Sequence, residues 1–146
     1  MSNNVSLKKP VTEDEFSKYY EFRWRILRKP WERPKGTEKD NKEEKSIHIM
    51  AVLNNKIVGC GRAHFNSKDQ VQIRYMAVDK QLRGQKIGTK ILLALEKEIK
   101  KIGAQEIILN ARSNAVSLYR KNGYETYKEG DILFGEIKHY WMRKWI

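Results

Sequence analysis

The segment Asp79-Lys-Gln-Leu-Arg-Gly-Gln-Lys-Ile-Gly88 is a polar, glycine-containing loop that lies between two apolar runs and decides the fold. Before it, Val71 to Val78 has the pattern of a β-strand. After it, apolar residues recur at helical spacing, at Ile87, Ile91, Leu92, Leu95, Ile99 and Ile102, until Gly103. Glu106 to Asn110 then carries a short apolar run typical of a buried parallel strand. Strand, loop, helix and strand in this order predict a right-handed βαβ crossover.

The residues before the crossover predict one helix and an antiparallel meander. Thr12-Glu-Asp-Glu15 has the capping-box pattern, so a helix is expected to begin there and to end at Lys29-Pro30. Ile47 to Leu53 and Ile57 to Phe65 are extended runs separated by Asn54-Asn55, which predicts a hairpin that continues into the strand before the loop. The fold class is therefore α/β (α+β), a mixed sheet with an antiparallel meander followed by a parallel crossover.

Three further segments complete the expected single domain, residues 1–146. Trp31 to Lys45 is polar and charged, so it is interpreted as an exposed connection. Ser113-Asn114 is expected to cap a short helix that contains Tyr119 and ends at Gly123. Extended runs follow around Tyr124 to Tyr127 and Leu133 to Arg143.

The net charge narrows the classes of partner. Thirty basic against 18 acidic side chains give a formal charge of +12, which attracts nucleic acid, an acidic membrane surface or a phosphorylated small molecule. Charge by itself does not choose among these three classes. The segment Lys80 to Lys101 holds many of the basic side chains and few acidic ones, so the crossover loop and its helix are where an anion is expected.

Cysteine and histidine usage argues against a metal centre. Cys60 is the only cysteine, which excludes an internal disulfide framework and a cysteine-rich zinc site, and it is predicted to lie in the core. The three histidines, His48, His64 and His139, are scattered without ligand spacing, so no metal is expected. No apolar run is long enough to span a membrane, and Met1 to Lys9 lacks the apolar core of a secretory signal. We therefore expect a cytoplasmic protein.

The loop Gln81 to Gly88 has the properties of an anion site. It precedes a helix, where unpaired backbone N–H groups and the positive end of the helix dipole favour phosphate. Gly84 lets a phosphate approach the backbone, and Arg83, Lys86 and Lys90 add positive charge. The alternative is a plain strand-to-helix turn with a solvated basic rim. The glycine spacing fits neither the dinucleotide fingerprint nor the P-loop.

Two motifs in this order resemble the GNAT superfamily of acyl-CoA-dependent N-acetyltransferases. Gln81-Leu-Arg-Gly84-Gln-Lys86 matches two of the three fixed positions of the superfamily's Gln/Arg-x-x-Gly-x-Gly/Ala motif. The segment Asn114 to Tyr124 resembles its Asn-x-x-x-x-x-Tyr-x-x-x-Gly-Phe/Tyr signature, with Tyr119 and Gly123 in place. The resemblance covers Ile47 to Tyr127. Gly135 to Met142 resembles the ending of the ElaA-like branch, which also has an Arg-Gly-x-Lys-x-Gly loop.

The resemblance implies a cofactor site and a reaction. The two parallel strands would splay around an acyl-CoA cleft, with acetyl-CoA as co-substrate and no metal. A primary amine of a small molecule or a protein would attack the thioester directly. The cofactor-binding residues implied are Met76, Ala77, Val78, Gln81, Arg83, Gly84, Gln85, Lys86, Ile87, Gly88, Thr89, Asn114 and Tyr119.

The resemblance also implies catalytic roles. Tyr119 matches the position that donates a proton to the departing thiolate, although core packing would equally explain a tyrosine there. His139 titrates near pH 7 and is a candidate base, although a lone histidine on a terminal strand is more often a packed residue. Glu136 and Glu21 are candidates to hold a cationic amine. The general base stays open among Tyr75, Glu21, Glu136, His64 and His139.

Two other functions remain as alternatives to this interpretation. A basic nucleic-acid-binding module would account for the charge, but the sequence has no nucleic-acid-recognition motif, and a phosphorylated cofactor already accounts for the basic cluster. A non-catalytic acyl-CoA-binding protein would keep the loop and make Tyr119 dispensable. No membrane partner is expected. Trp141, Trp145 and the late strand either form a homodimer edge or finish the sheet.

Overall fold

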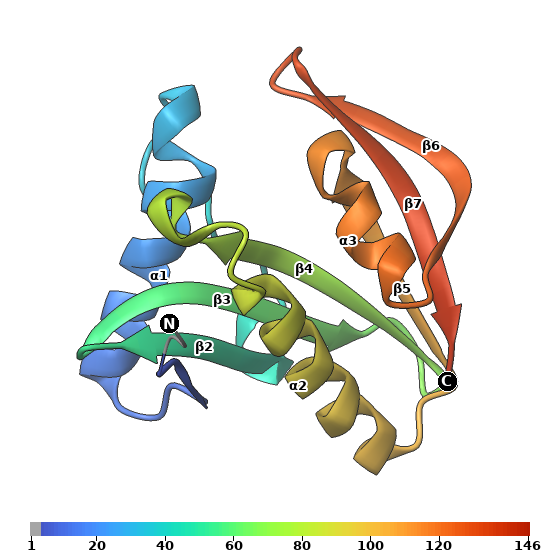
Figure 1. Cartoon of the computed structure of the whole chain (residues 1–146), viewed down its shortest axis with the longest axis horizontal. Coiled ribbons are helices and arrows are strands. Elements are labelled where there is room, and N and C mark those ends of the chain that lie inside the picture. The colour runs from blue at the N-terminus through green and yellow to red at the C-terminus, as the bar shows by residue number, and fades with distance from the viewer. Residues whose placement is uncertain (1–3) are drawn as a thin grey trace.

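The computed structural model describes residues 4–146, so Met1 to Asn3 of the expected domain lie outside the described residues. These residues form one seven-stranded sheet in the order β1-β2-β3-β4-β5-β7-β6 (Figure 1). The strands are β1 (Ser6–Lys8), β2 (Ile47–Leu53), β3 (Lys56–Phe65), β4 (Gln70–Val78), β5 (Glu106–Arg112), β6 (Glu125–Leu133) and β7 (Ile137–Trp145). The helices are α1 (Glu13–Leu27), α2 (Ile87–Ile102) and α3 (Val116–Lys121). The predicted mixed α/β fold is confirmed.

The sheet contains the predicted meander and crossover. β2, β3 and β4 pair antiparallel, and β4 pairs parallel with β5 through α2. The hairpin between β2 and β3 turns at Asn54 and Asn55, which both have positive φ. Gly103 ends α2 with a φ of 97°, as its position after the last periodic residue predicts. β1, a strand of three residues beside β2, was not expected because so short a run has no readable alternation.

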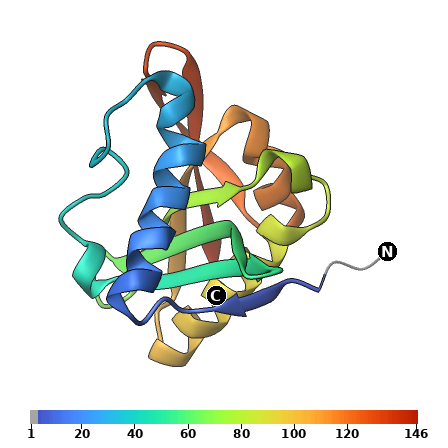
Figure 2. The ribbon, with the colours of Figure 1, turned by 90° about the vertical axis from the view of Figure 1, so that its left-hand side faces the viewer.

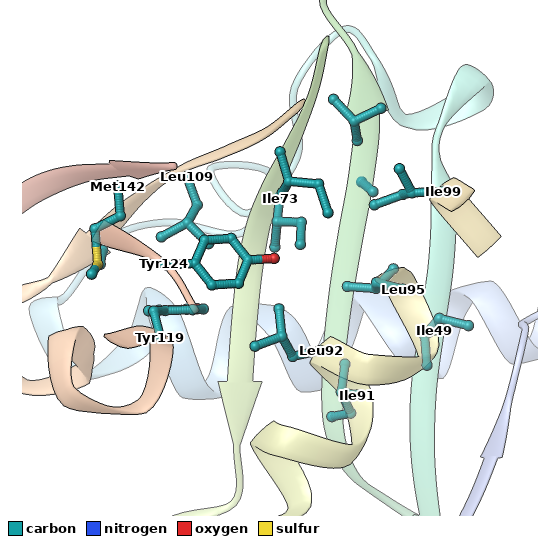
Figure 3. Packing of buried hydrophobic residues seen from close by; sticks show 14 of the residues in the cluster. Ile49, Ile73, Ile91, Leu92, Leu95, Ile99, Leu109, Tyr119, Tyr124 and Met142 are labelled. Atoms are coloured by element: carbon teal, nitrogen blue, oxygen red, sulfur yellow. The ribbon is translucent and has the colours of Figure 1, made fainter. Parts of the chain in front are cut away.

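The helices cover opposite faces of the sheet (Figure 2). α2 packs Ile91, Leu92, Leu95 and Ile99 against one face and forms the larger core cluster (Figure 3). Gly61 of β3 lies beneath it, where a Cβ would come within 2.8 Å of Ile91 Cγ2, so glycine allows the close approach. α1 covers the other face with a smaller cluster that includes Tyr19, Phe22, Cys60 and Tyr75. Cys60 is buried, as predicted.

α1 begins with the predicted capping box. The Thr12 hydroxyl accepts a hydrogen bond from the Glu15 backbone N–H at 3.0 Å, and the Glu15 carboxylate accepts from the Thr12 N–H at 3.1 Å. A hydrogen bond from Lys8 and these backbone donors lower the pKa of Glu15 to about 2. The cap is therefore ionised and complete at neutral pH.

In the C-terminal half, one prediction is wrong, and one of the two alternatives for the late strand is excluded. No side chain of Ser113 or Asn114 caps the short helix, because residues 113–115 form a 3-10 turn before α3 begins at Val116. β7 lies inside the sheet between β5 and β6, so the late strand presents no edge for a dimer. The edge strand is β6, and the homodimer stays a prediction.

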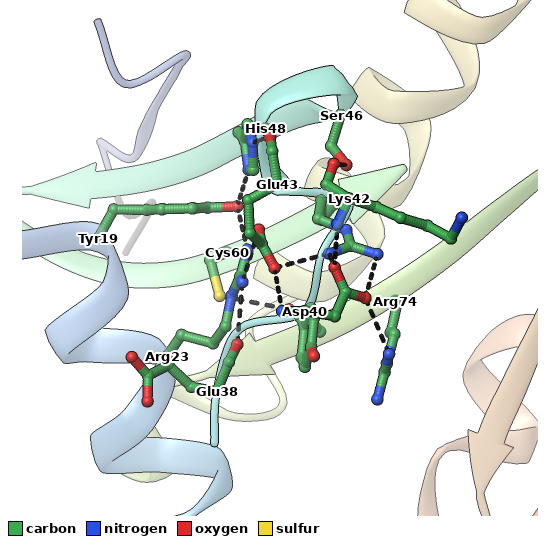
Figure 4. A network of polar contacts seen from close by, with 12 residues as sticks. Tyr19, Arg23, Glu38, Asp40, Lys42, Glu43, Ser46, His48, Cys60 and Arg74 are labelled. Carbon is green, nitrogen blue, oxygen red and sulfur yellow. Dashed lines mark hydrogen bonds and ion pairs between the residues drawn. The ribbon is translucent and has the colours of Figure 1, made fainter. Parts of the chain in front are cut away.

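The segment Trp31 to Lys45 is more than the exposed connection expected from its composition. Its Glu43 forms ion pairs with Arg23 and Arg62, and its Asp40 forms an ion pair with Arg62 (Figure 4). The side chains of both arginines are fully buried. Arg62 Nη1 lies 2.6 Å from Asp40 Oδ1 and 2.7 Å from Glu43 Oε2. These ion pairs fix the segment against β3, because removing either partner would leave a buried charge without compensation.

His48 makes stability depend on pH. Its Nδ1 lies 2.9 Å from Tyr19 Oη and its Nε2 lies 2.7 Å from the Glu43 carbonyl oxygen, inside the same network. Burial lowers the pKa of His48 below its ordinary value, so the unfolded chain binds a proton more readily than the folded one. We expect the melting temperature to fall as the pH drops from about 7 to about 5. His48→Gln should reduce this slope in thermal melts, and an unchanged slope would contradict the assignment.

Candidate active site

The two parallel strands separate halfway along their length. Pairing between β4 and β5 ends at Ile73 and Leu109, after which β4 continues to Val78 and β5 to Arg112 without contact between them (Figure 1). A β-bulge in β4 sharpens the divergence, because Cys60 pairs with Ala77 while Arg62 pairs with Arg74. The extra residue leaves Tyr75 with a φ of 59°, an unusual conformation for a bulky residue. The predicted splay is present in the structure.

A cleft of about 360 Å³ opens between the separated strands. Residues from the end of α1, from β4, β5 and α3, and from the β6–β7 hairpin line it, among them Met76, Asn110, Tyr119 and His139. Asn110 Oδ1 is buried here and has no hydrogen-bond partner in residues 4–146. Gly130 of β6 lies against this oxygen, where a Cβ would come within 2.5 Å, so the Asn110 side chain packs on the β6–β7 hairpin.

Tyr119 lies on α3 with its side chain 5% exposed and borders the cleft. Its ring packs edge-on against Tyr124 at a centroid distance of 5.8 Å, and the Tyr124 N–H donates to the Tyr119 carbonyl oxygen at 3.1 Å. Gly123, with a φ of 94°, allows that turn as predicted. Burial raises the pKa of Tyr119, so the phenol keeps its proton at every physiological pH. The group in the cleft is therefore a proton donor.

Of the candidates for general base, the structure brings His139 and Tyr75 to the cleft. His139 Nδ1 lies 2.9 Å from the Ile137 carbonyl oxygen, which accepts the Nδ1–H. Burial, with the charge of Arg112 as a lesser cause, lowers the pKa of His139 below its ordinary value. The imidazole is therefore neutral near pH 7, as a base must be.

The acidic candidates lie elsewhere. Glu136 is exposed in the turn between β6 and β7 and does not border the cleft. Glu21 is on the outer side of α1, where its carboxylate lies 3.0 Å from Lys35 Nζ. His64 also lies outside the cleft, hydrogen-bonded to Arg62 and Asn66. The structure therefore does not bring Glu136 together with Tyr119 and His139.

The loop after β4 leads into a helix start that no side chain caps. The first turn of this helix, α2, holds no acidic residue. Lys86, at the position where the motif has glycine or alanine, adopts a φ of 65°. Gly84 has a φ of 87° and leaves open space where a Cβ would point. Lys86 and Gly84 therefore both adopt left-handed backbone conformations, and the loop leaves the backbone open at Gly84.

The other predicted cofactor residues divide into four groups. Met76 and Tyr119 border the cleft itself. The side chain of Ala77 belongs to the α1 core cluster, which leaves only its backbone on the cleft side. Asn114 lies exposed in the turn next to Ala115. The remaining positions run from the end of β4 through the loop into the first turn of α2, and they are Val78, Gln81, Arg83, Gln85, Ile87, Gly88 and Thr89.

Four cleft residues were missed from the sequence. Arg28, Asn110, Arg112 and Asp131 all border the cleft but carry no motif. Arg112 gave one usable signal, since it is a charged residue at the end of β5, shortly after the buried apolar run. Arg28 follows α1 and reaches the cleft only through tertiary packing.

Residues 4–146 hold no group of three His, Cys, Asp or Glu side chains arranged to bind a metal. None of the helices in the same part of the chain is long and apolar enough to cross a membrane.

Comparison with known proteins identifies the family. The model of the acetyltransferase (GNAT) family matches residues 16–124. The uncharacterized N-acetyltransferase YjcF of Bacillus subtilis (strain 168) is 33% identical over 133 residues, which cover 90% of this chain and 94% of that protein. The chain therefore belongs to the acetyltransferase (GNAT) family and is an acyltransferase.

Solved structures share the fold. An aminoglycoside 6'-N-acetyltransferase complexed with coenzyme A matches with a TM-score of 0.78 at 18% identity, over 97% of this chain and 96% of that chain. A GNAT family acetyltransferase from Elizabethkingia anophelis with acetyl-CoA bound matches with a TM-score of 0.80 at 15% identity, over 98% and 99%.

Proposed function

We propose that the protein transfers the acetyl group of acetyl-CoA to a primary amine of a small molecule or a protein. The observation that carries the proposal is the divergence of β4 from β5 beside the uncapped start of α2. A long thioester with a pyrophosphate needs a cleft and an anion-binding group beside it, and the uncapped helix start would supply the second. The acetyl-CoA and coenzyme A bound in the related structures support the same cofactor. The proposal includes a cytoplasmic location.

Binding would use backbone groups at both ends of the cleft. Beyond the bulge, Met76 and Val78 of β4 have no partner strand on the cleft side, so their backbone groups are free to pair with the pantetheine arm. The pyrophosphate would lie against the N–H groups of the Gly84–Gly88 segment, within the field of Arg83, Lys86 and Lys90.

The cleft residues supply the groups that the reaction needs. The amine nitrogen attacks the thioester carbonyl carbon, a C–N bond forms, and the C–S bond breaks. Tyr119 gives its proton to the departing thiolate, and His139 takes the proton that the amine loses. A backbone N–H of β4 beyond the bulge stabilises the developing oxyanion. No role is proposed for Glu136, because it lies outside the cleft.

The test is release of free thiol from acetyl-CoA in the presence of primary amines. We expect amine-dependent thiol release together with the mass of the acetylated amine. Acetyl-CoA binding with no thiol release for any amine would support the non-catalytic alternative and contradict the proposal. Absence of acetyl-CoA binding, with salt-sensitive binding to nucleic acid, would support the other alternative.

Gly84→Val is expected to weaken acetyl-CoA binding by at least about tenfold, measured by calorimetry. A β-branched side chain at this left-handed position strains the loop and moves it away from the phosphate. Gly36→Val is the matched control, since Gly36 also has a positive φ and open space at the Cβ position but lies far from α2 in the sequence. Equal loss of acetyl-CoA affinity in both variants would contradict the loop's role.

A further inference from the structure

The cleft carries more positive charge than its own carboxylates balance. Arg28, Arg74 and Arg112 border it, whereas Asp131 is the one acidic side chain among the lining residues of the described chain. Cations that line a cleft without partners are costly, because each loses part of its hydration.

Only one of the three is neutralised by the protein. Arg74 Nη1 lies 2.9 Å from Asp40 Oδ2. Arg28 is buried and donates to the carbonyl oxygens of Thr37 and Leu27, which offer dipoles but no charge. The side chain of Arg112 forms no hydrogen bond or ion pair within residues 4–146. Arg112 is therefore the cation that lacks a counter-charge, whereas the buried carboxylate of Glu38 acts on Arg28 without forming an ion pair with it.

The strand register fixes where Arg112 points. Ala111 belongs to the core beneath α2, so its neighbour Arg112 projects from the opposite face of the sheet. Arg112 stands directly opposite His139 in the β5–β7 pair, and residues in that relation share a face. The guanidinium and the imidazole thus lie side by side on the α1 face of the cleft, where an acceptor would meet the thioester.

The electrostatics of this face favour an anion. Burial lowers the pKa of Arg112, and the nearby charges of Arg28 and Arg83 lower it further. The guanidinium groups of Arg28, Arg83 and Arg112 therefore repel one another, and a bound anion would relieve this repulsion. The charge of Asp131 acts on His139 in the opposite direction and partly offsets the lowering of the imidazole pKa that burial causes. The negative charge of the cleft thus lies near the base, and the unpaired positive charge lies beside it.

We infer that the acceptor amine also carries an anionic group, a carboxylate or a phosphate, which Arg112 and Arg28 bind. The inference rests on the proposed function and deepens it by naming the substrate class. The guanidinium of Arg112 has all of its donors available for a bidentate contact with either group. The amino end of such an acceptor lies toward Asp131 and His139, and its anionic end lies toward the arginines. Each end of the acceptor therefore meets a group of opposite charge in the cleft.

The experiment compares primary amines as matched pairs that differ only in the acidic group. β-Alanine is paired with β-alaninamide, and O-phosphoethanolamine with ethanolamine, within a wider panel built the same way. We expect kcat/KM of the wild-type protein to be on the order of 10²-fold higher for the acid than for its neutral partner in at least one pair. The amino-carboxylate and amino-phosphate arms identify which anion is preferred.

Arg112→Gln should abolish this preference. We expect kcat/KM for the acidic amine to fall on the order of 10²-fold, that of the neutral partner to change by less than about threefold, and acetyl-CoA affinity to be kept. Arg25→Gln is the matched control, because Arg25 is exposed on α1 and outside the cleft. Its kinetics should match those of the wild type.

Equal rates for both members of every pair in the wild-type protein would overturn the inference and leave the proposed function intact. Weaker acetyl-CoA binding by Arg112→Gln with the preference unchanged would also overturn it, because Arg112 would then serve the cofactor. Absence of thiol release with every amine is the separate result that rejects the proposed function, and the inference with it.

Discussion

Replacing Tyr119 by phenylalanine is expected to lower turnover on the order of 10²-fold or more, with acetyl-CoA affinity largely kept. The substitution removes one hydroxyl from a side chain that borders the cleft and keeps the ring that packs on Tyr124. Because burial keeps the phenol protonated, the group lost is an acid, and the thiolate would have to leave without its proton. Steady-state thiol release and calorimetry with acetyl-CoA measure the two quantities.

Tyr124→Phe is the matched control for this prediction. Tyr124 donates a hydrogen bond to Glu96 at 2.6 Å and does not border the cleft. Losing its hydroxyl should therefore lower the melting temperature and leave turnover within about threefold of the wild type. An unchanged turnover in Tyr119→Phe would remove Tyr119 from its role, and equal losses in both variants would indicate packing as the cause.

Arg62→Met is expected to lower the free energy of unfolding by about 3–5 kcal/mol. Arg62 is fully buried and its guanidinium reaches Asp40 and Glu43 together. The methionine would leave both carboxylates without their shared partner, although Glu43 keeps its contact with Arg23. Urea denaturation measures the change.

Arg74→Met separates a buried ion pair from an exposed one. Arg74 binds the same Asp40, but its side chain is 45% exposed, so water replaces the lost contact. We expect a loss within about 1 kcal/mol. Similar losses in both arginine variants would contradict the view that burial of Arg62 makes the network important.

The elements with strong local signals were predicted from the sequence. α1 has a complete capping box and α2 has six apolar residues at helical spacing before a glycine, and both are confirmed. The loop and Tyr119 were found through motifs, which are sets of residues at fixed spacing within a short stretch of chain. The divergence of β4 from β5 followed from the family resemblance and not from the residues themselves.

The polar network was missed because its composition has two interpretations. Asp40 and Glu43 lie in a charged stretch of the chain. Its composition is the same whether its carboxylates are solvated by water or form ion pairs with a buried arginine, as Asp40 does with Arg62. Arg62 was the available signal, as an arginine at an inward position of an otherwise apolar strand. Arg28 and Arg112 were missed for a related reason, since only the tertiary fold brings the end of α1 to β5. The assignment to the ElaA-like branch stays a prediction.

Calorimetric titration of the protein with acetyl-CoA tests the central claim most directly, beside adenosine 3',5'-bisphosphate and 4'-phosphopantetheine as the separate halves of the cofactor. The account predicts one site that binds acetyl-CoA far more tightly than either half, because the α2 loop and the β4–β5 cleft bind different parts of one molecule. Binding of the bisphosphate as tight as that of acetyl-CoA, or no binding of acetyl-CoA, would contradict it.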